Sequence, residues 1–234
     1  MANSGFSMQI IEIFKSLQGE SSYAGLPCVF VRLAGCNLRC VWCDSEYTFK
    51  GGSRMALDEV MREVRRLSPN GGLVEITGGE PMLQEREAIP LMERLLADGY
   101  KVLLETSGER PLDRVPPQVI KVVDVKCPDS GEGDTFRIEN LQFLSAADEL
   151  KFVIASRRDY EFACEFIREN GLGPRASSVI LSPAFRKDAT GSRDVANCAL
   201  DPQLLAEWML ADGLETRLGL QIHKFIWDPA LKGV

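Results

Sequence analysis

The stretch GCNLRCVWCDS, from Gly35 to Ser45, places three cysteines within eight residues, directly after a run of apolar residues. The preceding run, CVFVRLA at 28–34, is rich in β-branched and aromatic residues and predicts a buried strand. Spacings of three and two residues between the cysteines let one short loop direct three thiols toward a common point. The unit is therefore a strand that ends in a three-cysteine loop.

Strands and helices alternate on both sides of this unit. Strand-like segments are expected at 8–14, 28–34, 72–77, 101–106, 118–126, 149–155, 178–182 and 217–223. Apolar residues at helical spacing predict helices at 57–67, 85–97 and 158–169, and Asp201-Pro202 predicts the start of another. This alternation indicates a mainly parallel sheet covered by helices. About six units are too few for a closed eight-unit barrel, so we predict an open α/β fold, a partial (β/α)6-type barrel with some helices shortened or missing.

Polar and glycine-rich clusters follow several of the predicted strands. They are the cysteine loop, Gly78-Gly79-Glu80-Pro81, Ser107-Gly108, Lys126-Cys127-Pro128 and Ser182-Pro183. In parallel α/β folds the carboxyl ends of the strands meet at one edge, where ligands bind. We therefore expect these clusters to lie together.

Composition narrows the class of protein. The chain has 234 residues, 45% of them hydrophobic and 26% charged, and no linker-like stretch, which predicts a single domain over 1–234 that includes the strand 8–14 and the extension 224–234. A net charge of −7 disfavours nucleic acid as a partner, and no apolar run is long enough for a membrane span. The start MANSGFSMQI lacks the features of a signal peptide, so we expect a cytoplasmic protein with reduced cysteines.

The spacing of the three cysteines leaves two kinds of site open. A structural zinc ion needs four ligands, but His223 is far away in sequence and Cys28 lies at the opposite end of the preceding strand. Three thiolates can instead hold a four-iron cluster and leave one iron without a protein ligand. Spacing alone does not decide between an iron–sulfur cluster and a zinc or structural site.

The motif Cys36-x3-Cys40-x2-Cys43, with Trp42 before the last cysteine, resembles the signature of the radical S-adenosylmethionine superfamily. The resemblance implies a 4Fe–4S cluster on Cys36, Cys40 and Cys43, with S-adenosylmethionine (SAM) on the fourth iron. It also implies cleavage of SAM to a 5′-deoxyadenosyl radical inside a barrel that excludes water.

The same resemblance implies contacts with SAM at neighbouring strand ends. Gly78 and Gly79 would let the backbone approach the cofactor, and Glu80 would accept a hydrogen bond from its ammonium group. Contacts with the methionyl carboxylate and the ribose are implied for Thr106, Ser107, Lys126 and Ser182. Taken as residues alone, the Gly-Gly-Glu-Pro stretch also fits an ordinary turn from strand to helix.

Within the superfamily, nearly the whole chain resembles the 7-carboxy-7-deazaguanine synthase family. The segments that carry the resemblance are Gln18-Gly19-Glu20, Arg32, Cys43-Asp44-Ser45, Glu105-Thr106-Ser107-Gly108, Asp124-Val125-Lys126-Cys127-Pro128 and Gln221-Ile222-His223-Lys224. The resemblance implies ring contraction of 6-carboxy-5,6,7,8-tetrahydropterin to 7-carboxy-7-deazaguanine with loss of ammonia, in queuosine and 7-deazapurine biosynthesis. SAM would be used catalytically, because the hydrogen taken from C6 returns from 5′-deoxyadenosine.

The implied pterin needs a cation for its carboxylate and polar groups for its pyrimidine edge. Strand alternation places Arg32 on one face with Cys28 and Phe30, so Arg32 can bind the carboxylate if that face points inward. The alternative is an internal ion pair with Glu75 or Glu105. The other implied substrate contacts are Gln18, Glu20, Thr77 and His223, although a lone histidine on a strand is also commonly a core residue.

The resemblance further implies Mg²⁺, with Ser45 as a ligand where the family uses threonine. Serine keeps the hydroxyl but is less restricted in rotamer. A flavodoxin or ferredoxin is the expected electron donor, and a homodimer is expected. The family can end soon after its His-Lys pair, whereas this chain continues over 225–234, and we expect 129–144 to be a surface loop rather than a lid.

Two other classes of function are carried as alternatives. A radical activase that acts on a partner protein would share the cysteine loop, although Gln18-Gly19-Glu20 and His223-Lys224 speak against it. A non-enzymatic zinc or redox module would bind zinc in place of the cluster.

Overall fold

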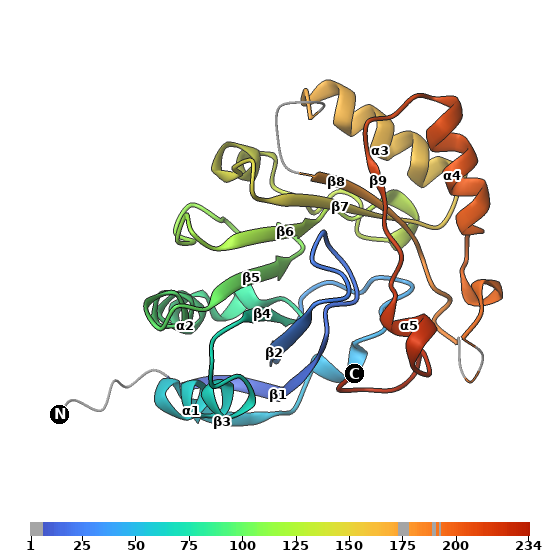
Figure 1. Ribbon diagram of the computed structural model, residues 1–234. Helices are drawn as coiled ribbons and strands as arrows, with labels where there is room; N and C mark the ends of the chain where they lie inside the picture. The colour runs from blue at the N-terminus through green and yellow to red at the C-terminus, as the bar shows by residue number, and fades with distance from the viewer. Residues whose placement is uncertain (1–6, 173–177, 189–190, 192) are drawn as a thin grey trace.

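The computed structural model describes residues 7–172, 178–188, 191 and 193–234 (Figure 1). Its strands form one sheet in the order β3-β1-β2-β4-β5-β6-β7-β8-β9. The strands are β1 (Ser7–Leu17), β2 (Pro27–Leu33), β3 (Ser53–Ala56), β4 (Leu73–Gly78), β5 (Lys101–Thr106), β6 (Ile120–Asp124), β7 (Glu149–Ile154), β8 (Ser178–Pro183) and β9 (Arg217–Leu218). All neighbours from β2 to β9 are parallel, and β1 is antiparallel to β2 and β3. The two edges of the sheet, β3 and β9, remain apart, which confirms the open partial barrel.

Four helices of at least ten residues accompany the described part of the sheet. They are α1 (Leu57–Leu67), α2 (Glu85–Ala97), α3 (Arg157–Glu169) and α4 (Pro202–Ala211), and Figure 1 shows them along the outside of the curved sheet. The fully described connections from β5 to β6 and from β6 to β7 contain only turns and the 3₁₀ helices Pro128–Ser130 and Ile138–Phe143. The prediction that some helices are shortened or missing is therefore confirmed.

Strand alternation separates the two faces of the sheet. Val29, Val31 and Leu33 of β2 lie in the main apolar core with the buried faces of the helices. Phe30 and Arg32 project from the other face, as the alternation in CVFVRLA predicts, and this face borders a cavity. The helices thus cover the apolar face, and the inner face is left to carry polar side chains.

Capping residues mark the helix ends at the predicted positions. The C-caps of α2 and α3 are Asp98 and Asn170, and each is followed by a glycine with positive φ. Asp201 caps α4 by accepting a hydrogen bond from the backbone N–H of Gln203 at 2.8 Å.

The predicted strand 217–223 is wrong over most of its length. β9 covers only Arg217–Leu218, and His223 begins the short helix α5 (His223–Ile226). The chain leaves the sheet after the backbone N–H of Gly219 donates to Leu181, because the N–H of Ile222 donates instead to the carbonyl of Gly19 at 2.9 Å. Contact with a distant loop therefore outweighs the alternating pattern.

Other differences concern strand ends and one short strand. β6 is shorter than the predicted 118–126 and β1 is longer than 8–14, whereas β3 was not predicted. The first six residues, on which the signal-peptide expectation partly rests, lie outside the described residues. Segment 129–144 contains the end of the 3₁₀ helix Pro128–Ser130 and the whole of the 3₁₀ helix Ile138–Phe143.

Candidate active site

One cavity on the inner face of the sheet brings together nearly all of the predicted site residues. Those that line it are Gln18, Glu20, Arg32, Cys36, Cys40, Cys43, Ser45, Thr77, Gly78, Gly79, Glu80, Thr106, Ser107, Lys126 and His223. Ser182 is buried on β8, where it pairs with Val153, and is not part of this lining. The carboxyl ends of the parallel strands and the loop between β1 and β2 thus converge on one space.

The cysteine loop is fixed by hydrogen bonds to its backbone. Arg39 donates to the carbonyls of Cys36 at 2.8 Å and Leu38 at 2.6 Å, and its guanidinium lies 4.1 Å from the ring centroid of Phe49. The N–H of Val41 donates to Ser130 in the connection after β6. These contacts hold the loop against the adjoining strand end.

The three thiols face the cavity from this loop. Burial raises the pKa of Cys36 and raises that of Cys40 to about 11, with Lys126 acting in the opposite direction at both. Such thiols are protonated near neutral pH, so ligation to iron has to displace the protons. In the described residues, no three His, Cys, Asp or Glu side chains are placed to hold a single metal ion. Three thiols on one loop beside a polar cavity fit the donor set of a four-iron cluster.

The glycines after β4 let the backbone pack directly against this loop. A Cβ at Gly79 would lie 2.2 Å from the carbonyl oxygen of Gly35 and 2.7 Å from the Cβ of Cys36. A Cβ at Gly78 would lie 2.6 Å from the carbonyl oxygen of Leu33. The cradle for the cysteine loop therefore requires glycine at both positions.

Glu80 ties the segments that follow β4 and β5 together. One carboxylate oxygen accepts from the N–H of Met82 at 2.9 Å and the hydroxyl of Thr106 at 2.8 Å. The other accepts from both the N–H and the hydroxyl of Ser107, each at 2.8 Å. Burial raises the pKa of Glu80, and these hydrogen bonds oppose the shift. Because four internal donors surround the carboxylate, Glu80 positions Thr106 and Ser107, and its contact with a cofactor ammonium stays a prediction.

A buried lysine organises the floor of the cavity. The Lys151 ammonium on β7 pairs with Glu20, with Glu105 at 2.7 Å and with Asp124 at 3.5 Å. Although burial disfavours its charge, the three carboxylates raise the pKa of Lys151 well above its usual value. Burial alone would raise the pKa of Glu20, but Lys151 and His223 outweigh it and lower that pKa to about 2.

Glu75 adds another carboxylate to the same floor. It is 3% exposed and accepts a short hydrogen bond from the Gln18 side chain. Burial, followed by the charges of Glu105 and Glu20, raises the pKa of Glu75 well above its usual value. Asp124 pairs with Lys126 at 2.8 Å, but its other oxygen is buried without a partner among the described residues. The floor is therefore rich in acceptors and suited to a ligand edge that presents N–H groups.

Arg32 has an internal partner, but not one of the two considered from the sequence. Its Nε donates to Glu12 at 2.9 Å, across the antiparallel pair of β1 and β2. Tyr47 donates to the same carboxylate oxygen at 2.7 Å. Burial disfavours the charge of Arg32, yet Tyr47 and Glu12 raise its pKa, so the cation is retained at the cavity wall.

The C-terminal segment forms the remaining wall. Gly19 packs beneath the imidazole of His223, because a Cβ there would lie 1.9 Å from Nδ1. Burial lowers the pKa of His223, so the neutral form is favoured. Lys224 pairs with Asp44 at 2.6 Å and thereby joins this segment to the cysteine loop, and Val234 also lines the cavity.

Ser45 is the predicted magnesium ligand. Its hydroxyl lies 3.7 Å from the sulfur of Cys43 and lines the cavity. The adjacent Asp44 carboxylate is engaged by Lys224, whose charge outweighs the effect of burial and lowers the pKa of Asp44. A hydroxyl at the cavity wall fits Mg²⁺ as one oxygen donor among waters and substrate oxygens.

Several residues at the site were given no substrate or cofactor role from the sequence, although Asp44, Glu105, Asp124 and Lys224 belong to segments that carry the family resemblance. These residues are Glu12, Asp44, Glu75, Glu105, Asp124, Lys151, Lys224 and Val234. A signal for some of them exists, because Glu75, Asp124 and Lys151 are charged residues inside strands that otherwise read as apolar. Their partners come from distant segments and carry no local signal.

The open parallel sheet and the cavity-facing cysteine loop define a radical SAM protein, and the model of the Radical SAM superfamily matches residues 31–124. The 7-carboxy-7-deazaguanine synthase of Koribacter versatilis (strain Ellin345) is 68% identical over 97% of this chain and 100% of its own length. The enzyme of the same name from Chlorobaculum tepidum is 42% identical over 97% of both chains. The chain therefore belongs to the 7-carboxy-7-deazaguanine synthase family.

A solved structure supports the fold. The crystal structure of QueE from Escherichia coli has a TM-score of 0.72 and 23% identity, and the match covers 93% of this chain and 95% of that one. Among the described residues, no helix combines the length and the apolar character that crossing a membrane requires.

Proposed function

We propose that this protein converts 6-carboxy-5,6,7,8-tetrahydropterin to 7-carboxy-7-deazaguanine and ammonia. The observation that carries the proposal is a single cavity in which the three-cysteine loop faces an acceptor-rich floor and a retained arginine. Family membership supports the same reaction, since relatives that match nearly the whole chain bear the synthase name. Cys36, Cys40 and Cys43 would hold the cluster, which together with bound SAM would supply a 5′-deoxyadenosyl radical for abstraction of a substrate hydrogen.

The floor of the cavity suits the pyrimidine edge of the pterin. Gln18, Glu20 and Glu105 offer amide and carboxylate oxygens to the N–H and amino donors of that edge, and the buried Glu75 lies beside them. Phe14 and Phe30 line the same cavity as a stacked pair with centroids 5.0 Å apart, which gives an apolar side to a ring system. A ligand with one apolar face and one donor edge fits both features.

The protein's other groups bind and orient the two ligands. Thr77 and His223 are further substrate contacts in this proposal, and Thr106, Ser107 and Lys126 hold the SAM carboxylate and ribose. Ser45 contributes its hydroxyl to a Mg²⁺ that also binds the substrate carboxylate. In this proposal a flavodoxin or ferredoxin supplies the electron, and the protein is a homodimer. The free thiols suit a reducing cytoplasm.

Anaerobic turnover tests the proposal. The reconstituted protein with SAM, a reduced flavodoxin and the pterin should give a product that is lower in mass by one ammonia, while SAM is not consumed in proportion. Exhaustive chelation of Mg²⁺ should reduce the rate. Absence of the contracted product would overturn the function and reopen the activase alternative, and equal rates after chelation would remove only the magnesium role.

Arg32→Ala should raise the KM for the pterin by roughly 30-fold or more, because a hydrogen-bonded charge pair contributes about 2 kcal/mol. Iron content and the KM for SAM should stay the same. Arg66→Ala removes an exposed arginine paired with Glu63 and provides the control, with kinetic constants like those of the parent. An unchanged KM in Arg32→Ala would show that the guanidinium serves only its pair with Glu12.

A further inference from the structure

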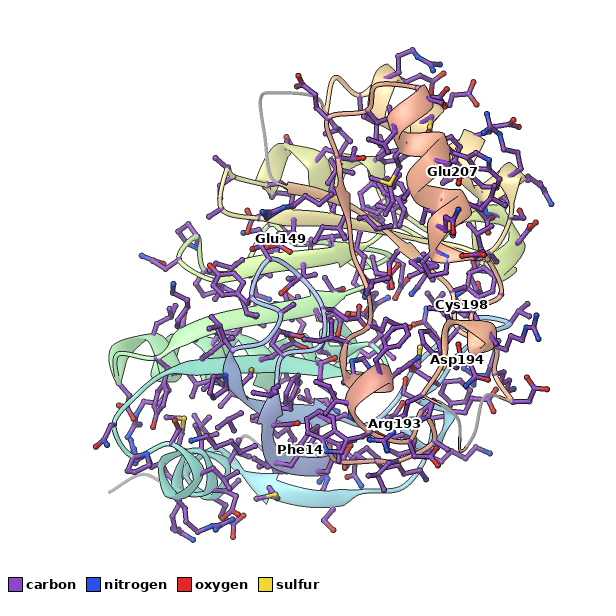
Figure 2. All side chains as sticks on the ribbon, turned by 45° about the vertical axis from the view of Figure 1, so that its right-hand side comes forward. Phe14, Glu149, Arg193, Asp194, Cys198 and Glu207 are labelled. Carbon is purple, nitrogen blue, oxygen red and sulfur yellow. The ribbon has the colours of Figure 1, made fainter. Side chains whose placement is uncertain are left out.

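The loop between β1 and β2 carries two of the proposed substrate contacts, Gln18 and Glu20. Its hydrogen bonds from the N–H of Gln18 to the carbonyl of Leu26 and from the N–H of Gly25 to the carbonyl of Gln18, each 2.8 Å, close its base. The tip reaches β7, where Figure 2 shows Glu149 beside it. Glu149 is the first residue of β7 and thus lies at the amino end of the parallel strands, opposite the cysteine loop.

The tip is attached through a buried carboxylate. The N–H of Ser22 donates to both oxygens of Glu149, at 3.1 and 3.0 Å, and the Ser22 hydroxyl makes a short hydrogen bond to one of them. Glu149 is only 2% exposed. A buried carboxylate is costly unless hydrogen-bonded, so the loop and Glu149 each need the other.

The contact between Ser22 and Glu149 lies next to the ion pair between Glu20 and Lys151 in the cavity floor. Glu149 and Lys151 are two residues apart on β7 and therefore project from the same face of the strand. Ser22 and Glu20 are likewise two residues apart in the loop. Lys151 pairs with Glu20, and Glu149 accepts hydrogen bonds from Ser22. The two pairs act as two adjacent points of attachment for the loop.

The backbone between these two points is strained. Ser21 has φ of 61°, a left-handed conformation that costs energy for a residue with a side chain. Such a conformation persists only where the surroundings fix it. Here Glu20 and Ser22 are both anchored on β7, so the turn at Ser21 is set from both sides.

We propose that Glu149 is a positioning residue: by holding Ser22, it fixes the strained turn that presents Gln18 and Glu20 to the substrate. This inference rests on the proposed function, because it takes Gln18 and Glu20 as substrate contacts. Glu149 itself does not line the cavity. Its effect is therefore on substrate binding and leaves SAM binding unchanged.

Glu149→Gln keeps the shape of the side chain but can accept on one oxygen only. We expect the KM for the pterin to rise roughly tenfold or more, since a charged hydrogen-bond acceptor is lost, with iron content and the KM for SAM unchanged. Hydrogen exchange of backbone amides over 18–26 should become faster in the same variant, with or without the cluster. Ser22→Ala should show a smaller rise, and its effect should not add to that of Glu149→Gln.

Asp148→Asn is the matched control. Asp148 is the preceding residue, equally buried, and it accepts from the backbone N–H groups of Lys121 and Ser145, away from the loop. An equal rise in pterin KM in this control, or unchanged KM and exchange in Glu149→Gln, would overturn the inference. If the parent protein does not convert the pterin, the proposed function fails instead, and unchanged exchange over 18–26 would separately remove the attachment.

Discussion

Lys151→Met should lower kcat/KM for the pterin by roughly a hundredfold or more, because Glu20 and Glu105 lose the cation that holds them in place. The thioether has a similar length but no charge, so the carboxylates repel one another and move apart. Steady-state kinetics with saturating SAM measures the loss. Iron content should remain that of the parent, since among the described residues the Lys151 ammonium pairs with Glu20, Glu105 and Asp124, all of which lie outside the cysteine loop.

The same substitution should also lower stability. Removing one partner of a buried ion pair costs about 3–5 kcal/mol, because the remaining charge is left buried. Here three carboxylates face a single ammonium that is 4% exposed. Chemical denaturation of the parent and the variant measures the difference in the free energy of unfolding.

The difference in stability should depend on pH with a definite sign. In the parent, the pKa of Glu20 is about 2, below its ordinary value of 4.5, so its ionised pair stabilises the fold above about pH 4.5. That stabilisation is lost as the pH falls through 4.5 toward 2. In the variant, burial is no longer opposed by Lys151 and raises the pKa of Glu20 instead. The difference in unfolding free energy between the two proteins should therefore narrow toward acid pH. The kcat/KM of the variant should fall further below that of the parent as the pH is raised, because the unpaired carboxylates ionise and repel one another.

Lys121→Met is the matched control for this prediction. Lys121 is also buried, pairs with Asp148 at 3.1 Å and lies outside the cavity lining. Its loss should cost comparable stability without moving the pH profile of kcat/KM. Identical pH profiles for Lys151→Met and the parent would show that Lys151 serves packing alone.

The sequence predicted the parts of this molecule that depend on neighbouring residues. Alternation in CVFVRLA correctly placed Val29 and Val31 on one face of the strand and Arg32 on the other. The structure shows that the first face packs into the core and that the second lines the cavity. Polar clusters that follow parallel strands had to meet at one edge, so the cysteine loop, Gly79 and Lys126 were brought together as expected.

Local sequence patterns did not predict the contacts between segments that are distant in the sequence. Lys151 meets Glu20 across 131 positions, and Ser22 meets Glu149 across 127. The helix at His223 forms because Ile222 bonds to Gly19, a contact that the alternating pattern of 217–223 does not contain. Such pairings follow from the packing of segments that are distant in the sequence, which local periodicity does not encode.

Gly79→Ala should prevent normal loading of the cluster and reduce turnover to background. The added Cβ would lie 2.2 Å from the carbonyl oxygen of Gly35 and 2.7 Å from the Cβ of Cys36. Backbone atoms cannot rotate away from such a contact, so the loop that carries the thiols has to shift. Iron and sulfide content after anaerobic reconstitution, together with the visible absorbance of the cluster, measures the result.

Gly99→Ala separates this steric effect from a general loss of stability. Gly99 has φ of 83° with nothing within 4 Å of an added Cβ, so alanine there strains only the backbone, at a cost of about 1 kcal/mol. Gly99→Ala should unfold more readily than the parent and still load iron normally. Full loading of Gly79→Ala would mean that the cysteine loop tolerates displacement, and that close packing of Gly79 against Gly35 does not fix the positions of the thiols.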